Sequence, residues 1–95
     1  MKIYLAGKIT DNPNYKEQFS NKQKELEAQG HIVINPVKPE GFNYKDYIDM
    51  GLCELMHCEA IYMLDGWKLS KGAKLECAYA VTVGIKIYYE NKITC

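Results

Sequence analysis

The chain has 95 residues and a mass of 10.9 kDa, with 47% hydrophobic and 25% charged residues. A chain of this size buries roughly 65% of the surface that its unfolded form exposes, which is enough for a single domain over residues 1–95. This ordinary composition excludes disorder. No apolar run approaches the ~18 residues of a membrane helix and no signal-peptide core begins the chain, so we expect a cytoplasmic protein with no membrane partner.

The charge balance disfavours a nucleic-acid partner. Twelve lysines offset twelve acidic residues, and the chain has no arginine. Proteins that hold a nucleic-acid backbone usually carry a basic surplus, and bidentate recognition of phosphate or guanine usually uses arginine. We therefore expect no nucleic-acid partner. Small phosphate-bearing ligands stay compatible, because backbone N–H groups at a helix N-terminus bind phosphate without arginine.

The four cysteines predict neither disulfides nor a metal site. A chain that builds its own core and has no secretion signal does not need a disulfide framework. Cys53 and His57 share one face of a helix, with Cys58 nearby, but no second ligand pair follows at a metal-site spacing. No metal or other cofactor is expected. We interpret these thiols, with Cys77 and Cys95, as small buried hydrophobes.

Strand and helix signals alternate in the first half of the chain. An apolar run over residues 2–7 predicts a strand, and the capping side chains and proline of residues 10–13 predict the start of a helix that Gly30 ends. The apolar stripe of this helix is narrow, so we expect it to lie on the surface. Residues 31–36 predict a second strand, and residues 44–56 predict a second helix.

The second half repeats the alternation. Residues 60–65 predict a third strand, residues 66–72 a loop, residues 73–83 a third helix and residues 85–89 a fourth strand. The third helix is apolar nearly all round, so we expect it to be largely buried against the sheet or against a second subunit.

This order predicts an α/β fold, a small doubly wound parallel sheet of the Rossmann or flavodoxin-like kind with helices on both faces. Four strands favour the order 2-1-3-4, in which the chain reverses direction between strands 1 and 3. Ligands of open α/β sheets bind at that switch point, outside the carboxyl ends of the strands. The loops that begin at Gly7 and Asp65 are therefore the candidate binding loops.

Few residues of these loops predict specific chemistry. Gly7 stands without the further glycines of a phosphate-binding or dinucleotide-binding loop, which excludes ordinary ATPases and Rossmann dehydrogenases. Glu76 either complements the dipole of the third helix or is a desolvated functional carboxylate beside the crevice. The Tyr4 hydroxyl either reaches the same crevice or belongs to a core tyrosine. Trp67 either stacks on a base or covers the core.

Together these residues resemble the nucleoside 2-deoxyribosyltransferase superfamily, which includes the deoxynucleoside 5′-monophosphate N-hydrolases. The similarity extends over residues 2–89. It is carried by three segments, namely Tyr4-x-x-Gly7-x-Ile9, Cys58-Glu59-Ala60-Ile61 and Ser70-x-Gly72-x-x-x-Glu76-x-x-x-Ala80.

The resemblance implies a retaining glycosidase chemistry. Glu76 matches the nucleophile, which attacks the anomeric carbon of a deoxyribosyl group and releases the base. Tyr4 matches the tyrosine that positions this nucleophile. Ser70 and Gly72 match residues that contact the phosphate in the monophosphate hydrolases. Gly7 and Ile9 match residues whose backbone contacts the sugar and phosphate. The superfamily also implies a homo-oligomer, in which a neighbouring subunit completes the site.

One position departs from the superfamily and leaves two functions open. The catalytic acid that protonates the leaving base falls on Gly51, and general-acid help is typically worth 10²–10⁴-fold. Asp49 points away around the helix, and Glu54 lies a turn farther from the strand ends. The chain is therefore either an enzyme that cleaves or transfers at the N-glycosidic bond of a nucleoside or its 5′-monophosphate, or a non-catalytic nucleotide-binding module. Cleavage of nicotinamide from NAD is a third, minor possibility.

Overall fold

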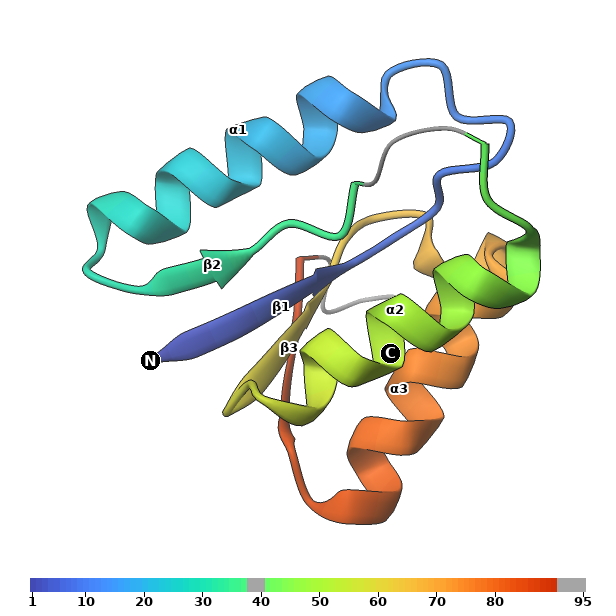
Figure 1. The fold of residues 1–95 in the computed structure, drawn as a ribbon. Helices are drawn as coiled ribbons and strands as arrows, with labels where there is room; N and C mark the ends of the chain where they lie inside the picture. The colour runs from blue at the N-terminus through green and yellow to red at the C-terminus, as the bar shows by residue number, and fades with distance from the viewer. Residues whose placement is uncertain (38–40, 91–95) are drawn as a thin grey trace.

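The computed structural model describes residues 1–37 and 41–90. Its four strands, all parallel, form one sheet in the order β2-β1-β3-β4, so the predicted α/β fold and strand order are confirmed (Figure 1). The elements in chain order are β1 (Lys2–Ala6), α1 (Tyr15–Ala28), β2 (Ile32–Ile34), α2 (Tyr44–Met56), β3 (Ala60–Met63), the 3₁₀ helix η1 (Trp67–Leu69), α3 (Lys71–Val83) and β4 (Lys86–Tyr89).

Helices cover both faces of the sheet (Figure 1). Side chains alternate between the faces along a strand, and β1 follows this rule. Ile3 and Leu5 pack with Phe19 of α1 in one buried cluster. Tyr4 lies in the other cluster, with Leu55 of α2 and residues of α3. The predicted placement of helices on both faces of the sheet is therefore confirmed, and β1 is buried on both sides.

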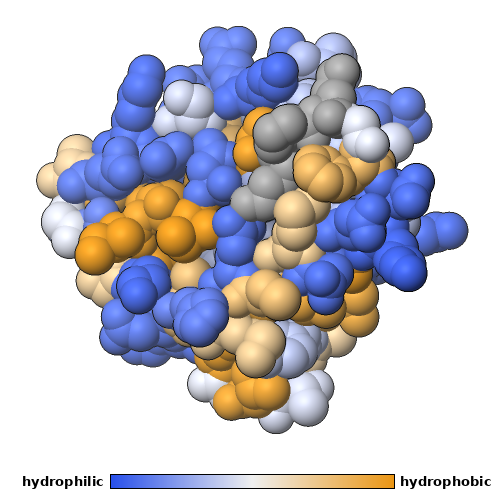
Figure 2. Space-filling view, in the orientation of Figure 1, coloured by the Kyte–Doolittle hydropathy of each residue, from blue (hydrophilic) through white to orange (hydrophobic). Residues whose placement is uncertain are grey.

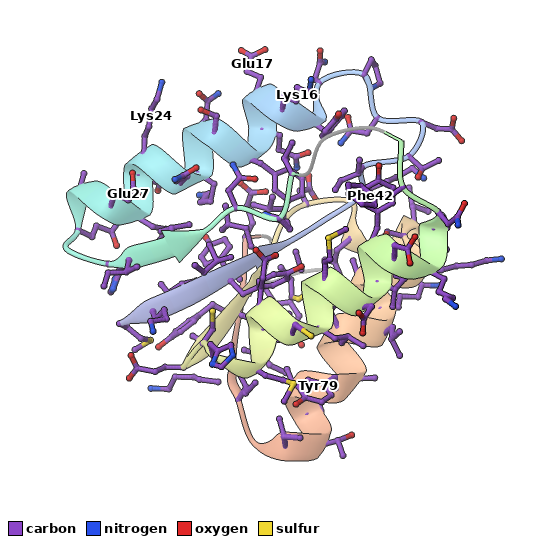
Figure 3. All side chains as sticks on the ribbon, in the orientation of Figure 1. Lys16, Glu17, Lys24, Glu27, Phe42 and Tyr79 are labelled. Atoms are coloured by element: carbon purple, nitrogen blue, oxygen red, sulfur yellow. The ribbon has the colours of Figure 1, made fainter. Side chains whose placement is uncertain are left out.

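Helix α1 lies on the surface, as its narrow apolar stripe predicts. Phe19 and Leu26 are its buried side chains. The side chains of Lys16, Glu17, Lys24 and Glu27 extend from its outer side (Figure 3).

The predicted start of this helix is wrong. Residues 10–13 form turns, with the Asn12 N–H donating to the Ile9 carbonyl, and the helix begins only at Tyr15. Asp11 has φ of 60°, a left-handed conformation that cannot continue into a right-handed helix.

Helix α3 differs from its prediction in two respects. It begins at Lys71 rather than at residue 73, because the Ser70 side chain accepts a hydrogen bond from the Ala73 N–H at 3.1 Å and caps the helix. Only one face of the helix is buried within the chain. Apolar side chains remain exposed on the rest of it, and an apolar area is visible at the lower end of the molecule, where α3 ends (Figure 2); the exposed side chains are Leu75, Val81 and Val83.

The cysteines are free thiols in the described part of the chain. Cys58 and Cys77 are buried, as predicted, whereas Cys53 is exposed, so the prediction is wrong for Cys53; Cys95 lies outside the described residues. Within residues 1–37 and 41–90, no group of three histidine, cysteine or acidic side chains is placed to hold a metal ion. Among the same residues, no helix has the length and apolar character needed to cross a membrane.

Candidate functional site

A large cavity lies at the carboxyl ends of the central strands. Its volume is about 780 Å³. Loop residues after β1, β2 and β3 and the first turns of α2 and α3 line it. This is the switch point where ligands of open α/β sheets bind. Five of the predicted site residues lie in the wall beside Tyr4, namely Gly7, Ile9, Ser70, Gly72 and Glu76.

Tyr4 and Glu76 form a hydrogen-bonded pair at this cavity. The Tyr4 hydroxyl donates to Oε2 of Glu76 over 2.6 Å, although the two residues stand 72 positions apart. Tyr4 is 1% exposed and Glu76 is 8% exposed. The parallel sheet explains the contact, because Tyr4 points from β1 toward the face that α3 covers. Glu76 is thus a core carboxylate that also borders the cavity, and not an exposed complement to the helix dipole.

Burial and hydrogen bonding act in opposite directions on this carboxyl group. Desolvation raises the pKa of Glu76 to about 7, against the hydrogen bond from Tyr4, which lowers it. The negative charge of Glu54 adds to the rise. Burial and the neighbouring Glu76 charge raise the pKa of the Tyr4 hydroxyl above its ordinary value, so Tyr4 stays a neutral donor. Near neutral pH Glu76 is therefore divided between a neutral acid and a poorly solvated carboxylate, and the carboxylate is the state that a nucleophile requires.

Gly51 of α2 lies directly against the pair. A Cβ atom at this position would stand 2.5 Å from Oε2 of Glu76 and 2.8 Å from the Tyr4 hydroxyl oxygen. Real Cβ atoms essentially never make contacts this short. The position that the resemblance aligns with the catalytic acid therefore does face Glu76, and any side chain there would force the Glu76 carboxylate or the Tyr4 hydroxyl to shift.

The amino end of α3 forms another part of the cavity wall. Ser70 caps the helix, and Lys71 and Gly72 of its first turn line the wall. The Lys8 ammonium group donates to the Leu69 carbonyl at 3.4 Å, which links the loop after β1 to this helix end. A helix N-terminus with lysines beside it suits an anion such as a phosphate.

Trp67 does not line the cavity with the other predicted residues. It packs against the buried cluster of α2, α3 and the sheet, with its ring centroid 6.0 Å from that of Tyr89. The structure thus supports the core-covering interpretation of Trp67 and not a stacking contact with a ligand in this cavity.

An aromatic wall is the part of the cavity that sequence reasoning missed. Phe42 precedes α2 (Figure 3), and Tyr44 and Tyr47 belong to its first turn; all three line the cavity, as does Tyr15 of α1. The Phe42 and Tyr47 rings meet edge to face, 5.9 Å apart. The spacing of the tyrosines on α2 indicates a core-facing stripe, which hides their second role. Their position at the start of a helix on the ligand-binding edge was the available signal.

Comparison with known proteins gives a match to one family model. No curated protein matches the chain. Residues 1–89 match the model of a family described as Domain of unknown function (DUF4406). Because the match spans all eight secondary-structure elements and the whole cavity, the chain belongs to the DUF4406 family.

Proposed function

We propose that this protein cleaves or transfers at the N-glycosidic bond of a nucleoside, a deoxynucleoside or a nucleoside 5′-monophosphate, with Glu76 as nucleophile. The observation that carries the proposal is the 2.6 Å hydrogen bond from the buried Tyr4 hydroxyl to Glu76, at the wall of a cavity of about 780 Å³. A carboxylate held this way serves displacement at an anomeric carbon.

The geometry supports a two-step course. The free oxygen of the Glu76 carboxylate attacks C1′ while the bond from C1′ to the base breaks, which leaves a glycosyl ester on the enzyme. Tyr4 holds the other oxygen, so the nucleophile keeps one orientation. Water or a second base then takes the sugar from Glu76. The helix end at Ser70 and the Lys71 side chain line the same cavity, and a 5′-phosphate bound there would be neutralised by them.

A non-catalytic nucleotide-binding module is the second candidate. Gly51 favours it, because the residue facing Glu76 has no side chain with which to protonate a leaving base. The cavity and the helix end would serve binding alone equally well. Binding of a deoxynucleotide without release of its base would establish this alternative.

The experiment is a chromatographic assay of free-base release. Deoxynucleosides, ribonucleosides, their 5′-monophosphates and NAD are incubated with the wild-type protein and with Glu76→Gln, which keeps the shape of the side chain but removes its charge. We expect release that Glu76→Gln lowers by at least ~10³-fold, as for other catalytic nucleophiles. Equal release by both proteins, or none by either, would refute the proposal.

Self-association belongs to the same proposal. Helix α3 exposes apolar side chains on the face that the single chain does not cover, and Val81 is 65% exposed. A second copy packed on this face would bury them. Light scattering should give at least twice the mass of one chain, and the mass of a single chain would refute the self-association.

A further inference from the structure

We infer that the substrate of this site carries a positively charged base, joined to the sugar through a quaternary ring nitrogen, as in pyridinium nucleosides and N7-alkylated purine nucleosides. This inference rests on the proposed function and specifies its substrate class. Three features of the cavity carry it: the glycine that faces the nucleophile, the aromatic wall and the charge of the buried carboxylate.

The first feature concerns the proton that a neutral base needs. A neutral nucleobase leaves as an anion unless an acid protonates it, and a positioned acid is worth 10²–10⁴-fold. The residue facing Glu76 is Gly51, where even a methyl group would stand 2.5 Å from the carboxylate oxygen. An acid side chain at this position would force Glu76 or Tyr4 to move from the positions that their hydrogen bond holds, and the chain has no side chain here. A base that already carries a positive charge needs no such acid.

The second feature is the aromatic wall. Phe42, Tyr44, Tyr47 and Tyr15 contribute rings to the same cavity as Glu76. The face of an aromatic ring attracts cations, and groups of such rings are a recurrent binding site for quaternary nitrogen. A neutral base would stack on these rings as well, but only a cation gains the additional electrostatic attraction.

The third feature is the electrostatic preference of Glu76 itself. The carboxylate is 8% exposed, and Tyr4 is its one hydrogen-bond donor given by the described residues. Glu54 contributes a second negative charge to its surroundings. An incoming cation compensates the buried charge and thereby favours the ionised, nucleophilic form. Substrate binding and activation of Glu76 thus reinforce one another for a cationic base and not for a neutral one.

The chemical step balances without a proton donor. A carboxylate oxygen of Glu76 donates an electron pair to C1′ and forms the ester bond. The bond from C1′ to the ring nitrogen breaks, and its electron pair neutralises the positive charge of the base, which leaves as a neutral molecule. Water then attacks C1′, the Glu76 carboxylate is regenerated, and the proton of the water passes to solvent.

The test compares charged and neutral bases on the same sugar. The pairs are 7-methylguanosine with guanosine, its 2′-deoxy counterpart with deoxyguanosine, and nicotinamide riboside with its uncharged dihydro form. Rates are measured as kcat/KM for wild-type protein, and the rate with Glu76→Gln is subtracted to remove spontaneous hydrolysis. We expect the charged member of at least one pair to be preferred by about 100-fold or more, the lower end of what a missing acid costs. The pair that responds distinguishes a pyridinium from an alkylated purine.

Two results would overturn the inference, and they differ in what they leave standing. Glu76-dependent release of neutral bases within tenfold of the charged ones refutes the cationic substrate and retains the proposed function. No Glu76-dependent release from any member refutes the cationic substrate, and the proposed function is then decided by the wider panel of deoxynucleosides, ribonucleosides, 5′-monophosphates and NAD. A second readout uses the ring of Tyr44, which lines the cavity. Tyr44→Leu should raise KM for the charged substrate about threefold to thirtyfold while Tyr44→Phe leaves it within twofold; equal effects of the two variants would contradict the role of the ring.

Discussion

Replacing Gly51 by alanine tests the contact around which the site is built. The new Cβ would stand 2.5 Å from Oε2 of Glu76, whereas ordinary contact begins at 3.4 Å, so the carboxylate must retreat by about 0.9 Å. This movement strains the 2.6 Å hydrogen bond to Tyr4 inside a packed core. Overpacking of this kind costs about 1–3 kcal/mol, and the better helix propensity of alanine returns up to about 1 kcal/mol. With the full gain from helix propensity, we expect a net loss of up to about 2 kcal/mol of unfolding free energy.

A mutant cycle separates the steric cost of the new Cβ from the gain in helix propensity. In a Tyr4→Phe, Glu76→Ala background both crowded oxygen atoms are absent, so Gly51→Ala should stabilise the protein by up to about 1 kcal/mol. The assay is urea denaturation followed by circular dichroism. We expect Gly51→Ala to lower the unfolding free energy of the wild-type protein and to raise that of the Tyr4→Phe, Glu76→Ala variant. If Gly51→Ala stabilises the wild-type protein as much as the background, the glycine is not there to make room. Where base release is measurable, a nucleophile displaced by about 1 Å should lose roughly 100-fold in rate.

Three further predictions concern the pair and the helix beside it. Burial raises the folded-state pKa of Glu76 from 4.5 to about 7, so the protonated side chain stabilises the protein fully below pH 4.5 and this stabilisation is lost as pH rises to 7. Urea denaturation should show a loss of about 3 kcal/mol of unfolding free energy over this pH range. The variant Glu76→Gln, which does not titrate, should show no such loss. Tyr4→Phe removes the hydrogen bond that lowers the Glu76 pKa, so a carbon-13 NMR titration should place that pKa higher, and an unchanged value would contradict the assigned bond. Ser70→Ala should destabilise the protein by about 1 kcal/mol through loss of the α3 cap, with Ser70→Asp as the control that retains it.

The fold was predictable because the hydrophobic pattern and the topology rules act on the whole chain. Alternating strand and helix segments admit few arrangements, and right-handed crossovers with a reversal between β1 and β3 give the observed order. Local conformations were less predictable. The positive φ of Asp11 delays the start of α1, and no periodicity in the sequence signals it. The sequence pattern predicts Ser70 in a loop although serine is a good helix cap, because the apolar run begins only three residues later.

The site was predictable where topology alone decides it. Residues at the carboxyl ends of parallel strands meet at one edge of the sheet, which brings Gly7, Ser70 and Glu76 to one cavity. The aromatic wall was not predictable, because Tyr44 and Tyr47 have the same spacing as core residues of an amphipathic helix. Trp67 illustrates the converse case, since the sequence leaves a stacking and a core-covering role open and only the packing of the side chain favours the second.

The glycine at position 51 and the buried carboxylate of Glu76 are best explained together. A glycine inside α2 costs up to about 1 kcal/mol of helix stability relative to alanine. A carboxylate in the core costs about 3 kcal/mol at neutral pH, as its pKa of about 7 implies. Each residue is unfavourable by the rules that govern the rest of the chain, yet the 2.5 Å approach shows that the Glu76 carboxylate occupies the space that a side chain at position 51 would need. Unfavourable residues of this kind occur mainly where a function requires them, and here both lie against the hydroxyl of Tyr4 in the wall of the cavity.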